Sequence, residues 1–321
     1  MSDLNLLSKT ISEVSEEIRN KNLSPVDLVT AQLEHIDKMR IPINSFITVL
    51  ADQAIEAAQK AEEEIAQGMY RGPLHGIPYA VKDNITTKGI RTTAGSKILT
   101  DWVPEEDAAV VTKMRDAGAI LIGKENLREF ASGTSGYNPH HGQIHNPWGL
   151  DRIPGGSSSG SGASVGSLQT FISFGTDGGG SVRIPSSLCG AVGFKQTHGR
   201  VSLRGALPPF SSTDHIAPIT RSVRDSALVL QVVAGYDDLD PTSVPVPVPD
   251  YEASLGQDIK GLVVGIPTNH YFDRLDKEVE MAVRKAIGVL QERGVTVKPV
   301  TINYLQYSGT GANAEGLVFH D

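Results

Sequence analysis

The sequence predicts an α/β fold with a mixed, mainly parallel central sheet flanked by helices. The main reason is that short apolar runs typical of strands alternate along the chain with longer stretches of helical periodicity. The clearest example is a strand at Leu262–Ile266, then an amphipathic helix at Asp276–Arg293, then a strand at Val295–Val300. This order predicts a parallel strand pair joined by a right-handed crossover.

The first part of the chain is predicted to be mainly helical. Ser24 followed by Pro25 is typical of a helix start, with serine as the N-cap and proline in the first turn. The elements expected here are an amphipathic helix at Leu4–Asn20, a second helix from Pro25 to about Arg40, a short strand at Ser45–Leu50 and a solvated helix at Ala51–Gln67.

The middle of the chain begins with a buried strand that ends on a charged residue, Tyr79–Lys82. A lysine in that position is costly unless it is paired, is neutral, or reaches water with its amine. The other elements expected are a helix at Ala108–Ala117, a strand at Ala119–Gly123, a helix or turn at Lys124–Phe130, a loop from Ala131, a helix at Asp225–Ala234 and an extended proline-rich loop at Leu239–Tyr251.

Composition excludes several classes of protein. The chain has 321 residues, 39% hydrophobic and 21% charged, as in ordinary globular proteins. The net charge is −8 and there is no basic stripe, so we expect no contact with nucleic acid. The single cysteine, Cys189, excludes an internal disulfide and suits a reducing compartment, so we expect a cytoplasmic protein. No long apolar run indicates a signal peptide or a membrane span.

The stretch Pro154–Pro185 carries the strongest functional signal. Glycine and serine dominate its two ends, whereas large apolar residues lie between them and argue against a flexible linker. The run Gly178–Gly180 allows successive backbone N–H groups to point into one concavity, which binds an anion or the oxyanion of an acyl-transfer intermediate. Ser181 follows this run directly and is a candidate nucleophile, which needs a histidine or lysine base.

Three motifs resemble those of the amidase signature family: GGSSSGSG, then GTDGGGSVRIP, and VKDN upstream of both. The resemblance implies a Ser–cis-Ser–Lys triad. In that triad Ser181 attacks the carbonyl carbon, Ser157 follows a cis peptide bond and relays the proton, and Lys82 is the neutral base. Two positions depart from the family pattern, because Ser159 stands where glycine is common and Gly178 where threonine is common. Neither departure removes a member of the triad.

The resemblance also implies a set of substrate-binding groups. Backbone near Ala131 would line the acyl side of the pocket, and Ser157 would lie beside the substrate. An oxyanion hole would be formed by the N–H groups of Gly178, Gly179, Gly180 and Ser181. The implied activity is hydrolysis of a small-molecule amide to the acid and ammonia or an amine, with no cofactor, metal or membrane contact. A homodimer is compatible with the sequence.

The resemblance covers nearly the whole chain. It implies a single domain at 1–321 with an amidase-signature fold that lacks the usual C-terminal part, because family members generally continue beyond the final NAEGLVFHD. One motif outside the resemblance is the HHxxxH group formed by His140, His141 and His145. This segment is turn-rich and has no carboxylate or cysteine at ligand spacing, so we interpret these residues as surface and loop histidines.

Other functions stay open at this point. Gly156–Gly160 and Gly162–Gly166 match the nucleophile elbow of α/β-hydrolases, but no clear strand precedes the first. Within the amidase signature family, the main alternative is the A component of a glutamyl-tRNA(Gln) or aspartyl-tRNA(Asn) amidotransferase, which releases ammonia from glutamine for a partner. Those components often have glutamine after the arginine that follows the nucleophile, whereas this chain has Ile184, so a stand-alone amidase is favoured. A non-catalytic fragment is the third alternative.

Overall fold

The computed structural model describes residues 3–207, 212–303 and 305. The chain divides into two compact units, Met1–Glu252 and Ala253–Asp321. Two such units can belong to one larger domain, so the single domain expected for residues 1–321 stays a prediction. The segment NAEGLVFHD, to which that expectation referred, lies outside the described residues.

The first unit begins with helices, and the predicted helix at Leu4–Asn20 is wrong in one respect. It is two helices, α1 (Asp3–Leu7) and α2 (Ile11–Arg19). The break occurs because Thr10 and Glu13 form a capping box, in which each side chain accepts from the backbone N–H of the other and starts a new helix.

The next two helices confirm their predictions, and one is longer than expected. Ser24 caps α3 (Pro25–Ile43), with its hydroxyl accepting from the N–H groups of the first turn. The helix ends at Asn44, whose left-handed backbone conformation is a common helix stop. A short strand, β1 (Phe46–Val49), and then α4 (Ala51–Ala66) follow as the sequence predicts.

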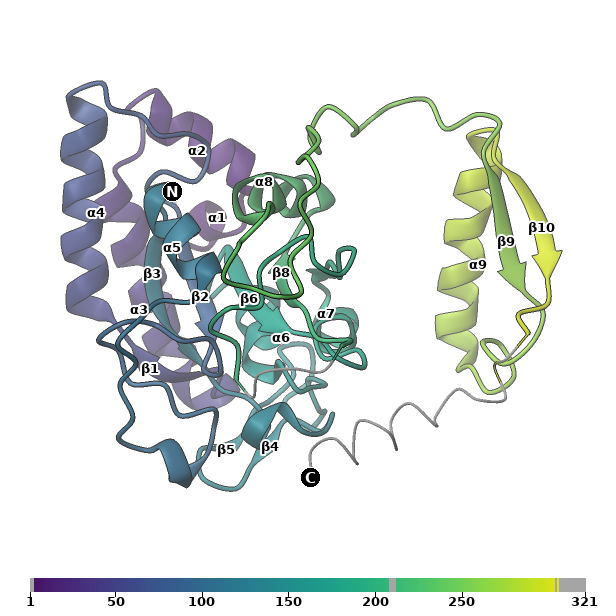
Figure 1. Ribbon diagram of the computed structural model, residues 1–321, viewed down its shortest axis with the longest axis horizontal. Helices are drawn as coiled ribbons and strands as arrows, with labels where there is room; N and C mark the ends of the chain where they lie inside the picture. Colours follow the sequence, from purple (N-terminus) through teal and green to yellow (C-terminus); the bar gives the residue numbers. More distant parts are fainter. Residues whose placement is uncertain (1–2, 208–211, 304, 306–321) are drawn as a thin grey trace. The chain divides into compact units, whose positions relative to one another are not determined.

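The centre of this unit is a six-stranded mixed sheet with the strand order β1-β3-β2-β6-β8-β7 (Figure 1). Strands β3, β2 and β6 run parallel to one another, whereas β1, β8 and β7 are each antiparallel to their neighbours. The sheet confirms the predicted mixed α/β architecture with a parallel centre. The strands after β1 are β2 (Pro78–Lys82), β3 (Ile120–Glu125), β6 (Ile172–Thr176), β7 (Val192–Gly193) and β8 (Ile216–Thr220).

Helices cover both faces of the sheet (Figure 1). On one face α3 and α4 pack through apolar side chains against the centre of the sheet, including Ala80 of β2 and Ile122 of β3. On the other face α2, α5 (Ala109–Asp116) and α8 (Val223–Val233) enclose a larger apolar cluster around Tyr79 and Phe174, whose rings meet edge to face at 6.3 Å. The core therefore holds the carboxyl ends of β2 and β6 in fixed positions.

The prediction of a helix or turn at Lys124–Phe130 is wrong for its first residues. Lys124 and Glu125 continue strand β3, and a short 3₁₀ turn, η2 (Glu129–Ala131), comes only later. Both charged side chains are fully buried and find polar partners on other segments, so their charge does not end the strand.

Two helices were missed because glycine and serine dominate or interrupt them. They are α6 (Ser159–Gly166) and α7 (Arg183–Cys189). A side chain at Gly160 would lie 2.4 Å from the Ser45 carbonyl oxygen, and one at Gly162 would lie 2.8 Å from Pro185. These glycines are needed for close backbone approach, so packing rather than helix propensity specifies α6.

The first unit also contains smaller elements. They are a 3₁₀ turn, η1 (Lys97–Leu99), and a hairpin of β4 (Tyr137–Asn138) and β5 (Gly142–Gln143). The proline-rich segment Leu239–Tyr251 contains no helix or strand, as predicted.

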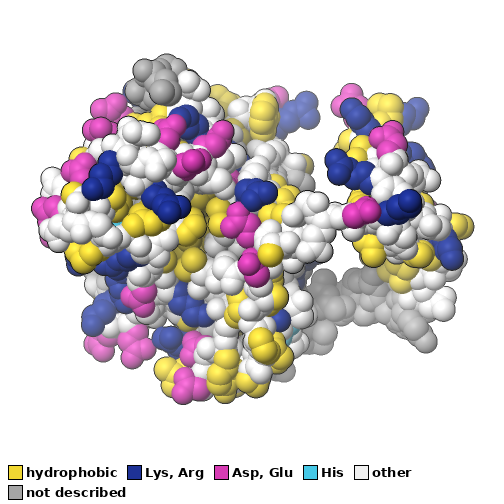
Figure 2. Space-filling view, turned by 90° about the horizontal axis from the view of Figure 1, so that it is seen from above, with side chains coloured by type: hydrophobic (Ala, Val, Ile, Leu, Met, Phe, Trp, Pro, Cys, Tyr) yellow, Lys and Arg dark blue, Asp and Glu magenta, His cyan; other side chains and the backbone are white. Residues whose placement is uncertain are grey.

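Figure 2 shows acidic and basic side chains interspersed over the face in view, with no basic stripe there. None of the helices in the described part of the chain is long and apolar enough to span a membrane.

The second unit contains β9 (Val263–Pro267), α9 (Lys277–Glu292) and β10 (Thr296–Val300). The two strands pair in parallel over their whole length, which confirms the predicted strand–helix–strand unit. The Asp276 carboxylate caps the helix, and Gly294 ends it with a positive φ of 83°.

Candidate active site

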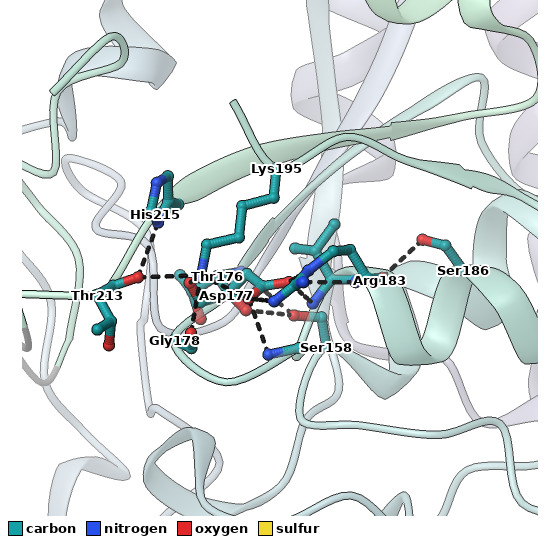
Figure 3. Close-up of polar contacts among 11 residues, drawn as sticks. Ser158, Thr176, Asp177, Gly178, Arg183, Ser186, Lys195, Thr213 and His215 are labelled. Carbon is teal, nitrogen blue, oxygen red and sulfur yellow. Dashed lines mark hydrogen bonds and ion pairs between the residues drawn. The ribbon is translucent and has the colours of Figure 1, made fainter. Parts of the chain in front are cut away.

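The glycine-rich loop after β6 is organised by the carboxylate of Asp177 (Figure 3). This carboxylate accepts from the backbone N–H of Gly180 at 2.8 Å and of Val182 at 3.1 Å. It also binds two cationic side chains, the Arg183 guanidinium and the Lys195 ammonium, each at 3.0 Å. Burial alone raises the pKa of Asp177, but these hydrogen bonds outweigh it and hold the pKa well below its usual range. The loop is therefore built around a permanent negative charge.

Ser181 lies between two residues that this carboxylate fixes. Its side chain is partly exposed, and its carbonyl oxygen accepts from the N–H of Ser158 at 3.1 Å. The hydroxyl of Ser181 forms no hydrogen bond with any described residue. The described residues therefore do not bind the Ser181 hydroxyl, and it can turn towards a substrate.

Backbone N–H groups in this loop form two sets. The N–H of Gly180 donates to Asp177, whereas those of Gly178, Gly179 and Ser181 donate to no acceptor within the described residues. A side chain at Gly179 would meet no atom of the described residues within 4 Å, so none of them fills the space next to this glycine. Of the four N–H groups expected in an oxyanion hole, three are therefore available and the fourth holds the loop.

Lys82 is fully buried at the end of β2. Its Nζ donates to Ser157 Oγ at 2.8 Å and to Thr176 Oγ1 at 2.7 Å. Burial lowers the pKa of Lys82 to about 7, although the carboxylates of Asp214 and Asp177 act in the opposite direction. A substantial fraction of the side chain is therefore neutral at pH 7 and has a lone pair available for a proton.

Ser157 is fully buried between the Lys82 strand and the glycine-rich loop. The Gly156–Ser157 peptide bond is cis, as the resemblance implies, and the Ser157 carbonyl oxygen accepts from the N–H of Arg128 at 3.2 Å. The structure brings Lys82 and Ser157 together directly. It places Ser181 on the adjacent loop with no hydrogen bond from its hydroxyl to Ser157 among the described residues.

Ala131 closes the short turn η2 and has a positive φ of 58°, which is uncommon for a residue with a side chain. Residues on either side of this turn approach the site: the backbone N–H of Arg128 donates to the Ser157 carbonyl oxygen, and the Gly133 carbonyl oxygen would lie 2.9 Å from a side chain at Gly156. The segment around Ala131 therefore packs against the cis peptide bond.

Sequence reasoning did not give a role to Thr176 or Lys195, although both contact predicted site residues. Thr176 could have been found, because it ends the strand that precedes the glycine run. Lys195 could not, because nothing near it in the sequence indicates that its ammonium lies beneath the loop.

The predicted loop histidines have ordinary partners: His140 bonds Glu129 at 3.1 Å and His145 bonds the Leu150 carbonyl oxygen at 2.6 Å.

A buried lysine–serine pair beside a glycine-rich loop with available N–H groups, set at the strand ends of a mixed α/β sheet, suits acyl transfer. The chain belongs to the amidase family, whose sequence model, described as Amidase, matches residues 27–315. This match confirms the resemblance seen in the motifs.

Relatives of the same family extend this finding. The chain is 43% identical over 305 residues to the A component of glutamyl-tRNA(Gln) amidotransferase from Heliobacterium modesticaldum, covering 95% of this chain and 63% of the relative. It is 44% identical over 305 residues to the protein of the same name from Geobacter metallireducens, with the same coverage. The chain thus spans less than two thirds of the length of these curated relatives.

Among solved structures, the native peptide amidase from Stenotrophomonas maltophilia matches with a TM-score of 0.88 and 33% identity, covering 96% of this chain and 64% of that one. The A component of glutamyl-tRNA(Gln) amidotransferase from Thermotoga maritima matches with a TM-score of 0.81 and 35% identity, covering 94% and 63%. Both matches confirm the predicted fold class.

Proposed function

We propose that this protein cleaves a carboxylic acid amide through an acyl-enzyme on Ser181, with Ser157 as the proton relay and Lys82 as the base. The observation that carries the proposal is the 2.8 Å hydrogen bond between Lys82 Nζ and Ser157 Oγ in a fully buried position. A lysine that bonds hydroxyls and has its pKa lowered to about 7 is suited to accept a proton near neutral pH.

The reaction begins when Ser181 Oγ attacks the carbonyl carbon of the amide. The Ser181 proton passes to Ser157, whose own proton passes to Lys82. Negative charge that develops on the substrate oxygen is stabilised by the available N–H groups of Gly178, Gly179 and Ser181. The tetrahedral intermediate collapses, the C–N bond breaks, and the leaving nitrogen takes the proton back along the same path. Water then hydrolyses the acyl-enzyme with the same groups as base and acid.

Arg183 lies close after the nucleophile in the sequence, but its charge does not indicate which substrate is bound. Its guanidinium is bound to Asp177, so it supports the loop and is not directed at an acyl group. The acyl side of the pocket would instead meet backbone near Ala131.

The direct test is Ser181→Ala, with ammonia release measured over a panel of aliphatic, aromatic and peptide-like amides. We expect kcat to fall by about 10⁴-fold or more, because loss of a nucleophile typically has this effect. The matched control is Ser187→Ala on the adjacent helix, whose exposed hydroxyl bonds the Ile184 carbonyl oxygen. Retention of more than a few per cent of activity in Ser181→Ala would exclude it as the nucleophile.

A second candidate function is favoured by the names of the relatives, which are A components of an amidotransferase. In that case the same chemistry would act on glutamine, and the ammonia would be used by a partner protein. Ammonia release from glutamine only when the other amidotransferase components are added would favour this function over a stand-alone amidase. A fluorophosphonate probe separates both from a non-catalytic protein, since only a competent Ser181 is labelled.

A further inference from the structure

The proposed reaction gives no role to Glu125, a fully buried acid. Glu125 ends strand β3, and its carboxylate accepts from three serine hydroxyls. Ser161 donates at 2.7 Å and Ser164 at 2.5 Å, both from α6, and Ser173 donates from β6. No cationic side chain forms an ion pair with Glu125 in the part of the chain that the structure describes. A buried carboxyl without a cation is costly and calls for a reason.

Glu125 is the cross-strand neighbour of Lys82. The two residues are registered partners in the parallel pair β2–β3, so their side chains leave the sheet on the same face. From the other elements around it, Glu125 meets the serine hydroxyls of α6 and β6, and Phe46 is its registered partner on β1. The charged groups that raise the pKa of Lys82 are the carboxylates of Asp214 and Asp177, both beside the glycine-rich loop.

Glu125 also holds the helix that begins beside the catalytic pair. Helix α6 starts two residues after Ser157, and it is fastened to the end of β3 at three points. These are the two serine–Glu125 bonds and the Gly160 N–H, which donates to the Asn126 carbonyl oxygen at 2.8 Å. A shift of α6 would therefore move Ser157 relative to Lys82.

We propose that Glu125 is a positioning residue for the Lys82–Ser157 pair, which anchors α6 through its serines and acts on the Lys82 ammonium across the shared sheet face. This inference rests on the proposed function for its effect on catalysis, but the coupling between the two side chains does not. Burial raises the pKa of Glu125 to about 7, against the effect of the serine hydrogen bonds, so its charge changes in the same pH range as that of Lys82.

The first experiment measures the pH profile of kcat/KM for Glu125→Gln. Removing the negative charge makes protonated Lys82 less stable, so the rising limb of the profile should move to lower pH by about half a unit to one unit. Asp225→Asn, at another buried carboxyl that accepts from Ile11 N–H on a distant helix, is the matched control and should leave the limb in place. An active Glu125→Gln with an unshifted limb would overturn the proposal.

The second experiment needs no activity. A double-mutant cycle with Lys82→Met and Glu125→Gln compares urea unfolding midpoints at pH 7 and pH 9. We expect the double variant to deviate from additivity by about 0.5 M urea at pH 7, and the deviation to vanish at pH 9 where Lys82 is neutral. Additivity at both pH values would refute the coupling, whereas a chain inactive on every amide would count only against the proposed function.

A third variant covers the case in which Glu125→Gln does not fold. Ser173→Ala removes one donor to the Glu125 carboxylate and leaves the α6 anchors in place. With one hydrogen bond fewer, Glu125 carries less charge at neutral pH, so the limb should again move to lower pH, by less than about half a unit. A limb identical to that of the unsubstituted protein would contradict the proposal.

Discussion

Two lysines are fully buried on neighbouring strands of the same sheet, and their surroundings differ. Lys82 ends β2 and is registered with Glu125, whereas Lys124 in β3 is registered with Val81, so the two lysines leave the sheet on opposite faces. The Nζ of Lys82 bonds two hydroxyls. The Nζ of Lys124 bonds the Ile85 carbonyl oxygen and two threonine hydroxyls.

Lys82 and Lys124 also differ in whether a carboxylate lies beside the amine. Asp83 lies 3.7 Å from Lys124, whereas no carboxylate forms an ion pair with Lys82 among the described residues. Burial lowers the pKa of Lys124 to about 8, opposed by Asp83, and that of Lys82 to about 7. The same side chain thus serves as a structural cation where a carboxylate and a carbonyl surround it and as a candidate base where hydroxyls do.

Of the changes that separate the two lysines, the one with the largest expected effect is the loss of catalysis at Lys82. Lys82→Arg keeps a positive charge that cannot be released near neutral pH, so we expect kcat to fall by about 10³-fold. Lys82→Ala should lose more activity than Ser157→Ala, because water can partly replace a relay hydroxyl, and should abolish the base limb near pH 7. Lys113→Arg, which replaces a half-buried lysine that bonds helix-end carbonyls, is the control. Near-normal kcat in Lys82→Arg would remove the distinction between the two buried lysines.

The next effect is on stability, at Lys124. Lys124→Met leaves the buried Asp83 without its cation and the Ile85 carbonyl oxygen without a donor. We therefore expect a loss of about 3–5 kcal/mol in the free energy of unfolding. Urea unfolding at pH 7.5 measures this loss, and kcat per folded molecule should change only a few-fold. A loss below about 1 kcal/mol would show that the Asp83 pair is not structural.

The smallest expected effect is a gain in the free energy of unfolding, in Lys82→Met. Between the unfolded pKa near 10.5 and the folded pKa of about 7, the unfolded chain binds a proton that the folded chain does not. Lys82 therefore lowers the stability of the folded protein as pH falls through this window, and methionine removes that loss. After allowing for two lost hydrogen bonds, Lys82→Met should be about 2 kcal/mol more stable at pH 7. The gain should shrink towards pH 10, and a gain that is independent of pH would be inconsistent with a neutral lysine.

The sequence predicted what depends on local pattern and missed what depends on distant partners. Ser24 as an N-cap and the parallel β9–β10 pair were predictable because a few neighbouring residues specify them. The continuation of β3 through Lys124 and Glu125 was not, since the groups that satisfy these charges lie on segments about 30 to 50 residues away.

In the candidate site, too, the sequence predicted the local motifs and missed the contacts between distant residues. Its serines and lysine were named from motifs, and the structure brings Lys82 and Ser157 together. The use of the Gly180 N–H by Asp177 could not be predicted, because a run of glycines does not indicate which of its N–H groups turns inward.

The Asp177 carboxylate has a consequence for how the protein should respond to acid. Its pKa lies well below the usual range, so the stability that it gives the loop is present above about pH 4 and is lost only in stronger acid. Lys82 takes up its proton near pH 7, far above that point. Between the two, mild acid should stop the proposed chemistry while the glycine-rich loop keeps its shape. After a brief exposure to pH 5, activity should therefore return as soon as the protein is back in neutral buffer, without a refolding step.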